Sequence, residues 1–493
     1  MNEPANTRPP LSVADVMPRH RDLFYAGAWQ RPQGGYTSTS NPATGETLGE
    51  CAVANANDVD AAARAAHRAF ADWRRMRPYD RGAVMRMIAG RLRAHADELA
   101  LIDAANGGNP VSEMTADVHA AAAQLDYFAG LAAEARGETI PMGGDALDMT
   151  LREPFGVCAR IVAYNHPLMF TAAKMAAPLA AGNTVIMKPP EQAPLSAYRM
   201  MEIIGDAAPP GVINVLTGGA ACGEALVAHP LIPRLALIGS VGTGRAILRG
   251  AAERLKHVTL ELGGKNACIV YADADVDKAI AGAVAGMNFT WCGQSCGSTS
   301  RVFVHASLHD RVVAGIVEAT RRFMPGLPTE RSTTMGAIIS RAQLDKIERY
   351  VKLGREEGAT LACGGERPHD PALAKGFFMS PTVFTGVTQQ MRIAQEEIFG
   401  PVLCVLSWTD EARMLADVNS VEYGLSCSIW TRDLATAHRS AAAVDAGYVW
   451  INNTGRHFLG APFGGYKQSG QGREESFDEL LSYTQVKNVH VAL

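Results

Sequence analysis

Between about residues 157 and 262, short apolar segments alternate regularly with stretches that carry helix signals. The apolar runs of strand length lie at 157–163, 184–187, 212–216, 234–238 and 258–262. Pro167 suits the first turn of a helix after the first run, and this helix is expected to end at Gly182. Such alternation is typical of βαβ units, and it predicts a parallel sheet covered by helices.

The rest of the chain carries further secondary-structure signals. Residues 1 to about 20 are expected to form a loose arm, and 23–29 to contain short strands. Asn57 or Asp58 is placed to cap an amphipathic helix. Further helices are expected at 81–93, 96–105 and 116–135, a second α/β series at about 267–460, and a strand-like tail at 481–491.

Length and charge limit the class of protein. At 493 residues, the chain is long enough for two or three domains. The formal net charge is −4 and no dense basic run occurs, so we expect neither nucleic acid nor a membrane as a partner. No apolar run approaches membrane-spanning length, and residues 1–24 lack the apolar core of a secretory signal. We therefore expect a cytoplasmic protein.

Among the nine cysteines, Cys296 has an unusual setting. The odd number and the lack of a Cys-x-x-Cys pair argue against a disulfide framework and a zinc ribbon. Cys292 and Cys296 have no second pair of metal ligands nearby, so no metal site is expected. The neighbours of Cys296 are Gly, Gln, Ser and Thr rather than the aliphatic residues around a core cysteine. This composition suits a reactive thiol and an ordinary loop equally.

Two strand ends carry further candidate groups. The run at 234–238 leads into the Gly-rich segment 239–244, whose backbone N–H groups at a helix start would suit the phosphates of a dinucleotide. A plain tight turn fits that segment equally well. Glu261 lies beside Gly263 and Gly264 at the end of another run and is a candidate general base, with a solvated carboxylate as the alternative.

Seven motifs in one order along the chain are specific in combination. They are Tyr164-Asn165-His166-Pro167, Lys188-Pro189-Pro190-Glu191, Gly239 with Gly244, Glu261-Leu262-Gly263-Gly264-Lys265, Gly293-Gln294-Ser295-Cys296, Glu397-Ile398-Phe399-Gly400-Pro401 and Pro462-Phe463-Gly464-Gly465-Tyr466-Lys467. In this order, from about residue 22 to the C-terminus, the chain resembles the aldehyde dehydrogenase superfamily. The resemblance implies an α/β fold with two Rossmann-like domains and a small bridging sheet.

The resemblance also implies a division of the chain. Residues 1–130 and 152–262 would form the NAD-binding domain, and 263–476 the catalytic domain with its nucleophilic cysteine. Residues 131–151 and 477–493 would form a bridging sheet used in a homodimer or homotetramer. An unpaired tail strand suits that role, because a free sheet edge can form hydrogen bonds with a strand of another subunit.

By the same resemblance, five residues would carry the reaction that turns an aldehyde into a carboxylic acid. Cys296 matches the nucleophile, which forms a thiohemiacetal and then a thioester. Asn165 and the backbone N–H of Cys296 match the oxyanion hole. Glu261 matches the base that activates water, and Lys174 and Glu474 match groups that relay protons from it.

The cofactor implied is NAD rather than NADP. Lys188 and Glu191 match residues that hold the adenosine ribose, where a carboxylate accepts hydrogen bonds from the 2′-hydroxyl and repels a 2′-phosphate. Glu397 matches the ligand of the nicotinamide ribose, and Phe399 matches the residue beside the nicotinamide. Ser240 and the turn from Gly239 to Gly244 match the pyrophosphate site. The remaining cofactor-binding candidates are Ala163, Tyr164, Gly218 and Leu262.

The acyl pocket departs from the common pattern of the family. His166 stands where Phe is more frequent, and Ala173 stands where a bulky aromatic is common. These differences suggest a wider and more polar pocket for a medium-sized or aromatic aldehyde. The other pocket candidates are Met169, Trp291, Ser295, Arg456, His457, Phe458 and Phe463. Trp291 and Phe463 fit a packing role as well.

Other substrates and functions are compatible with parts of this pattern. Arg456 with His166 and His457 leaves a carboxylate-bearing semialdehyde open. A betaine-type substrate is disfavoured, because a quaternary ammonium group binds in a cage of aromatic rings and few aromatic residues are expected in this acyl pocket. A CoA-acylating relative would not need the hydrolytic base Glu261. A purely structural protein would not need the reactive thiol.

Overall fold

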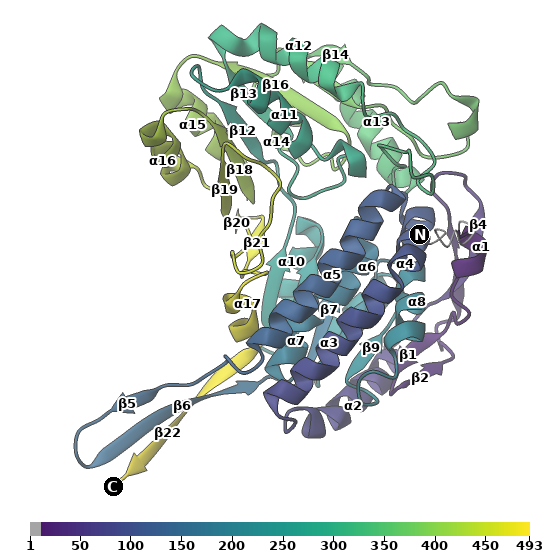
Figure 1. Cartoon of the computed structure of the whole chain (residues 1–493), viewed down its shortest axis with the longest axis vertical. Coiled ribbons are helices and arrows are strands. Elements are labelled where there is room, and N and C mark those ends of the chain that lie inside the picture. Colours follow the sequence, from purple (N-terminus) through teal and green to yellow (C-terminus); the bar gives the residue numbers. More distant parts are fainter. Residues whose placement is uncertain (1–10) are drawn as a thin grey trace, which may run out of the picture.

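The computed structural model describes residues 11–493 and contains two α/β units and a projecting arm (Figure 1). The first unit has an eight-stranded sheet in the order β2-β1-β9-β8-β7-β10-β11-β21. Its strands are β1 (Leu23–Tyr25), β2 (Ala28–Gln30), β7 (Val157–Ile161), β8 (Thr184–Lys188), β9 (Ile213–Val215), β10 (Arg234–Ile238), β11 (His257–Glu261) and β21 (Gly470–Gln471). The strands from β9 to β11 are parallel, whereas β1 and β21 add antiparallel edges.

Helices cover both faces of this sheet. They are α1 (Val13–Val16), α2 (Ala56–Trp73), α3 (Pro78–Ala94), α4 (Ala96–Gly107), α5 (Val111–Leu131), α6 (Pro167–Ala173), α7 (Ala176–Ala181), α8 (Leu195–Ile204), α9 (Ala220–Ala228) and α10 (Val241–Ala252). Val185 and Met187 of β8 pack into the core beneath α3 to α8, while Ile186 packs into a second core beneath α2, α9 and α10. This alternation is the pleat of a strand buried on both sides.

The second unit has a seven-stranded sheet in the order β14-β15-β16-β13-β12-β18-β19. Its strands are β12 (Ala267–Val270), β13 (Arg301–His305), β14 (Thr360–Cys363), β15 (Thr382–Thr385), β16 (Val402–Trp408), β18 (Ser426–Trp430) and β19 (Tyr448–Ile451). Its helices are α11 (Val276–Gly286), η1 (Phe289–Trp291), η2 (Ala306–Leu308), α12 (His309–Thr320), α13 (Arg341–Glu356), η3 (Pro371–Leu373), α14 (Arg392–Gln395), α15 (Glu411–Asn419) and α16 (Leu434–Ala443). This is a second α/β layer structure with its own two cores.

The arm is a three-stranded sheet in the order β22-β6-β5, and it projects away from both units with the C-terminus at its tip (Figure 1). It comprises β5 (Thr139–Pro141), β6 (Ala146–Pro154) and β22 (Thr484–Ala492), with α17 (Phe477–Ser482) at its base. Two small ribbons complete the fold, β3 (Tyr36–Ser40) with β4 (Thr47–Ala52), and β17 (Tyr423–Gly424) with β20 (Tyr466–Lys467). No helix within residues 11–493 is long and apolar enough to cross a bilayer.

The two-unit α/β architecture expected from the sequence is confirmed, with local corrections. Asn55, rather than Asn57 or Asp58, caps α2, and its side chain accepts the N–H groups of both those residues. The loose N-terminal segment expected at 1–20 contains the helix α1, while residues 1–10 lie outside the described part of the chain. The tail strand β22 is not unpaired, because it pairs along its whole length with β6.

The single helix expected from Pro167 to Gly182 is two helices. Lys174 ends α6, and α7 begins at Ala176. Pro178 explains the break, since its ring has no N–H and would clash with the carbonyl of residue 174 in a continuous helix. The break places Lys174 at a helix end, where its side chain reaches Glu474. The domain boundaries at 130, 151, 262 and 476 remain predictions.

Candidate active site

Cys296 lies in a loop that Asn266 holds in place. The side-chain amide of Asn266 donates to the carbonyl oxygens of Cys296 at 2.7 Å and of Ser298 at 3.0 Å. Gly293 allows the tight entry to this loop, because its φ is +64° and a Cβ there would lie 2.3 Å from the carbonyl oxygen of Gly400. The loop thus presents Cys296 with a fixed backbone.

The thiol of Cys296 is surrounded by groups that oppose its ionisation. Burial, followed by the carboxylates of Glu397 and Glu261, raises the pKa of Cys296 to about 12. The residue still lines the large cleft between the two units together with Asn165 and Glu261. A nucleophilic role therefore needs either a base or a nearby positive charge.

Glu261 ends β11 with its side chain buried. Neither carboxylate oxygen has a hydrogen-bond partner among residues 11–493. Burial, and next the negative charge of Glu474, raises the pKa of Glu261 well above its ordinary value. A raised pKa makes the Glu261 carboxylate a stronger proton acceptor, which is what a general base requires.

Glu474 is held by two buried cations. Its oxygens lie 2.7 Å from Nη2 of Arg160 and 2.9 Å from Nζ of Lys174. Burial opposes its ionisation, but these two cations prevail and lower the pKa of Glu474 to about 2. Glu479 lies 3.7 Å from Arg160 and stays closer to neutral, since burial raises its pKa to about 7. The cluster is a chain of charged groups that leads away from Glu261.

Asn165 lies in the loop after β7, between the cofactor cleft and α6. Its backbone carbonyl accepts a hydrogen bond of 2.8 Å from the side chain of Asn109, which fixes the loop. Its own side-chain amide makes no hydrogen bond to the described residues 11–493. The amide is therefore available to donate to a developing oxyanion.

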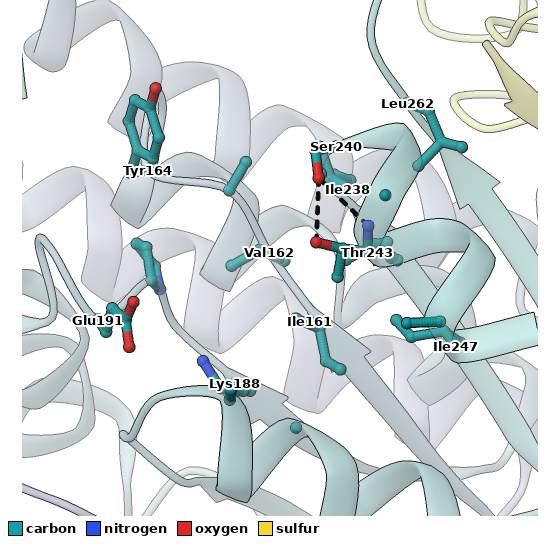
Figure 2. A pocket seen from close by; sticks show the side chains of 18 of the residues that line it. Ile161, Val162, Tyr164, Lys188, Glu191, Ile238, Ser240, Thr243, Ile247 and Leu262 are labelled. Carbon is teal, nitrogen blue, oxygen red and sulfur yellow. Dashed lines mark hydrogen bonds between the residues drawn. The ribbon is translucent and has the colours of Figure 1, made fainter. Parts of the chain in front are cut away.

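The cleft has a volume of about 840 Å³, which falls within the range of roughly 300–1,000 Å³ seen for small-molecule sites. Figure 2 shows its lining, with Tyr164, Lys188 and Glu191 on one side and Ser240 and Thr243 at the start of α10 on the other. The predicted cofactor residues that line it are Ala163, Tyr164, Lys188, Glu191, Gly239, Ser240, Leu262, Glu397 and Phe399. The Ser240 hydroxyl caps α10 by accepting the Thr243 N–H at 3.2 Å.

Gly218 and Gly244, also predicted to bind the cofactor, stand behind this lining. A Cβ on Gly244 would lie 2.9 Å from the Leu262 side chain, and one on Gly218 would lie 3.0 Å from Cys222. These two glycines allow close packing of the elements that shape the cleft.

The end of the cleft near Glu191 has the chemistry that a ribose needs. A Cβ on Gly219 would lie 2.6 Å from a carboxylate oxygen of Glu191, so a larger residue there would push that carboxylate aside. Lys188 is buried beside it, and burial lowers the pKa of its amine. An exposed carboxylate and a buried amine at one end of a long cleft fit the two hydroxyls of a ribose.

At the other end of the cleft, Glu397 is anchored by the Gly263-Gly264 pair. The Gly264 N–H donates to Glu397 at 2.9 Å, and a Cβ on Gly263 would collide with the carboxylate at 2.3 Å. Phe399 has a left-handed backbone (φ +57°) and packs edge-on against Tyr164 at 5.7 Å between ring centroids. The strained Phe399 backbone fixes the position of this ring, which lines the same cleft as Cys296.

The predicted substrate residues lie outside the lining of the cofactor cleft, and the aromatic ones among them form two groups. His166 packs edge-on against Trp291, with centroids 4.6 Å apart, and Met169 and Ala173 follow it on α6. His457 packs against Phe463 at 4.3 Å and against Tyr448 at 5.7 Å. Ser295 precedes Cys296, and its hydroxyl accepts the Gly297 N–H.

The pocket contradicts one sequence-based expectation. Few aromatics were expected, but Tyr448, Trp450, His457 and Phe463 form one cluster of rings. Arg456 is exposed, with its guanidinium stacked over Phe458, and its backbone carbonyl accepts a hydrogen bond from Trp450 of this cluster.

Several residues of the site were not identified from the sequence. They are Asp117, which pairs with His166; Asn266, which holds the Cys296 loop; Arg160, which pairs with Glu474; and Gln343 and Lys346, which line the cleft. Asn266 adjoins a quoted motif and was detectable from it. Asp117 lies on an alanine-rich helix, where nothing in the local pattern distinguishes it.

Comparisons with known proteins agree with this architecture. Residues 29–489 match the Aldehyde dehydrogenase family. The chain is 52% identical to the aldehyde dehydrogenase tropH of Talaromyces stipitatus over 98% of this chain and 95% of that protein. It is 43% identical to a betaine aldehyde dehydrogenase of Mesorhizobium japonicum over 91% and 92% of the two chains.

Solved structures show the same fold. The NAD⁺ complex of a Bacillus cereus aldehyde dehydrogenase superimposes with a TM-score of 0.93 at 39% identity, covering 96% of this chain and 97% of that one. The indole-3-acetaldehyde dehydrogenase AldA of P. syringae, solved with NAD⁺ and IAA, gives 0.95 at 35% identity, covering 98% and 100%. With a cysteine, a buried carboxyl group and an asparagine amide on one cleft of this fold, the chain belongs to the aldehyde dehydrogenase family.

Proposed function

We propose that this chain oxidises an aldehyde to the free carboxylic acid with NAD⁺. The observation that carries the proposal is that Cys296, Glu261 and Asn165 line one cleft, whose far end carries the exposed carboxylate of Glu191. The two relatives described above are named as an aldehyde dehydrogenase and a betaine aldehyde dehydrogenase, and the two similar structures contain NAD⁺. A dehydrogenase function follows from both lines together.

The first step is attack of the Cys296 sulfur on the aldehyde carbon. The thiol loses its proton to solvent, and the new C–S bond forms as the carbonyl π bond breaks. The oxygen gains a negative charge, which the Asn165 amide and the Cys296 N–H stabilise as hydrogen-bond donors. NAD⁺ held by Lys188, Glu191 and Glu397 would supply the hydride acceptor for this adduct, whose oxidised form is a thioester on Cys296.

Hydrolysis then releases the acid. Glu261 takes a proton from water, the hydroxide adds to the thioester carbon, and the C–S bond breaks to return the Cys296 thiolate. The positive charges of Lys174 and Arg160 lie around Glu474, which in turn raises the pKa of Glu261. We assign Lys174 and Glu474 as positioning residues that set the proton affinity of this base and pass its proton outward.

We assign NAD⁺ rather than NADP⁺ as the cofactor. Glu191 is an exposed carboxylate that lines the cleft, and Gly219 lies close to it in the same lining. A carboxylate accepts the hydrogen bond that a 2′-hydroxyl donates, but it repels a 2′-phosphate. Lys188 would then hold the other ribose hydroxyl.

An assay of NADH absorbance with a panel of aldehydes, with and without CoA, tests the proposal. We expect turnover without CoA, and loss of turnover in Cys296→Ala. In Glu261→Gln, a burst of about one NADH per active site should be followed by slow hydrolysis. Full turnover by Cys296→Ala would overturn the mechanism. Turnover only in the presence of CoA would favour the acylating relative, and no turnover with any aldehyde would favour a structural role.

We further propose that the arm makes the protein a homodimer or homotetramer. In the arm, β22 lies at one edge of the three-stranded sheet, so one of its sides has no partner strand within residues 11–493. Its exposed residues include Val486, at 58% exposure, and Val491. A projecting sheet with a free edge and apolar side chains is suited to cover a second copy of the chain. A cytoplasmic location remains a prediction from the sequence.

A further inference from the structure

His166 is tied to Asp117 beside the proposed reaction centre. Nδ1 of His166 lies 2.7 Å from an oxygen of Asp117, and both residues are only 6% exposed. His166 directly follows Asn165 in the chain. Asn165 lines the cofactor cleft, whereas His166, Met169 and Trp291 do not. His166 therefore lies outside the lining of the cofactor cleft, and we place the acyl portion of the substrate of the proposed oxidation on its side of Asn165.

The second ring nitrogen of His166 is not used by the protein. Nε2 makes no hydrogen bond to any residue between 11 and 493, although the ring is packed edge-on by Trp291 at 4.6 Å and Phe170 at 5.2 Å. The Asp117 pair and the two aromatic contacts fix the orientation of the ring. A fixed imidazole with one unused nitrogen is a built hydrogen-bonding group rather than a packing residue.

The charges around His166 decide what it can bind. Burial alone would lower the pKa of His166, but Asp117 together with Asp103 and Glu113 raises it above its ordinary value. Burial raises the pKa of Asp103 to about 7, and burial and Asp117 also raise the pKa of Glu113. The imidazole is thus surrounded on the protein side by three carboxyl groups.

These charges disfavour an anionic substrate group. A substrate carboxylate at Nε2 would be repelled by the acidic cluster of Asp103, Glu113 and Asp117. A hydroxyl group suits either protonation state of His166, because it accepts from Nε2–H and donates to a bare Nε2.

We propose that His166, oriented by Asp117, selects aldehydes that carry a hydroxyl group on a ring-containing acyl portion. Trp291 and Phe170 pack edge-on against the imidazole, and aromatic surroundings of this kind favour a planar ring in the substrate. The inference rests on the proposed aldehyde oxidation and adds the substrate class. His166 acts here as a specificity-determining residue, and Asp117 as its positioning residue.

The test compares matched aldehydes with the wild type, His166→Phe and His166→Gln. The panel contains the three hydroxybenzaldehyde isomers, the three tolualdehydes that replace the hydroxyl with a methyl group, 4-formylbenzoate and betaine aldehyde. The readout is the ratio of kcat/KM for each hydroxyl compound to that for its methyl counterpart. Comparing this ratio between the wild type and a variant cancels the intrinsic reactivity of each aldehyde.

For at least one isomer, we expect the ratio to be about tenfold higher in the wild type than in His166→Phe, equivalent to about 1.4 kcal/mol. His166→Gln, which keeps a donor and an acceptor, should restore part of it. His119→Phe, the same substitution at an exposed site on α5, should keep the wild-type ratio. If neither His166 variant folds, the wild-type panel alone decides, since the hydroxyl compound must be its best substrate.

An equal ratio in the wild type and His166→Phe would overturn the inference. A wild-type preference for 4-formylbenzoate or betaine aldehyde would also overturn it. In all of these cases aldehydes are still oxidised, so the proposed function stands. If the wild type oxidises no aldehyde in the panel, nor hexanal, then it is the proposed function that fails.

Discussion

Replacing Glu474 with glutamine should destabilise the protein strongly, although the side chain keeps its shape. Glu474 is 3% exposed and accepts from Arg160 at 2.7 Å and Lys174 at 2.9 Å. A glutamine has one acceptor oxygen and would turn its amide N–H₂ toward the other cation. One buried cation would then lack its partner.

Two independent routes give the size of the effect. At an effective dielectric constant of about 20, each ion pair contributes about 6 kcal/mol of Coulomb energy, most of which desolvation cancels. Breaking such a buried pair typically costs about 3–5 kcal/mol. A pKa of Glu474 that falls from its ordinary 4.5 to about 2 corresponds to about 3 kcal/mol. We therefore expect a loss of about 3 kcal/mol at pH 7.

Denaturant unfolding followed by tryptophan fluorescence measures this loss. Because folding lowers the pKa of Glu474, its contribution is complete above about pH 4.5 and declines as the pH falls toward 2. The difference between wild type and Glu474→Gln should therefore be smaller at pH 3 than at pH 7. Glu153→Gln is the matched control, since Glu153 pairs with Lys487 in an exposed ion pair and its loss should leave the midpoint nearly unchanged. Equal unfolding midpoints for wild type and Glu474→Gln at pH 7 would refute the reasoning.

Three further predictions concern the cofactor, the nucleophile and the arm. Glu191→Gln removes the charge that repels a 2′-phosphate, so the ratio of kcat/KM for NADP⁺ to that for NAD⁺ should rise about tenfold; an unchanged ratio would contradict the assignment of Glu191. Glu261→Gln removes an anion that raises the pKa of Cys296, so iodoacetamide should alkylate Cys296 faster at pH 8, by about tenfold for each unit by which the thiol pKa falls; a slower reaction would count against the electrostatic argument. Deletion of 484–493 removes β22, and light scattering should then show a lower mass than for the full chain, whereas an equal mass would exclude the arm from assembly.

Local sequence patterns predict much of the fold. The strand expected at 234–238 has the same bounds as β10, because a fully buried parallel strand is a continuous apolar run between turn residues. The break between α6 and α7 depends on a single residue, Pro178, within an otherwise helical pattern. Pro178 is a helix-breaking residue, but the apolar residues on both sides of it favoured one continuous helix in the sequence-based prediction.

Pairings between distant residues could not be predicted in the same way. His166 and Asp117 are 49 positions apart, and Arg160 and Glu474 are 314 positions apart. Asp117 lies on α5 and His166 in the loop after β7, whereas Arg160 lies on β7 and Glu474 in the segment before α17. Each pair therefore depends on tertiary packing. The motifs identified Cys296 as a candidate, but they carried no information on the buried charges that set the pKa values around it.

The position of β21 in the first sheet has a consequence for synthesis of the chain. β21 pairs with the edge strand β11, although about 210 residues separate them in sequence. A ribosome adds about 5–20 residues each second, so the edge of β11 stays open for roughly 10–40 s after it emerges. A nascent sheet with an unpaired edge can pair with other chains, so this interval is when the protein is most exposed to misassembly and most dependent on chaperones.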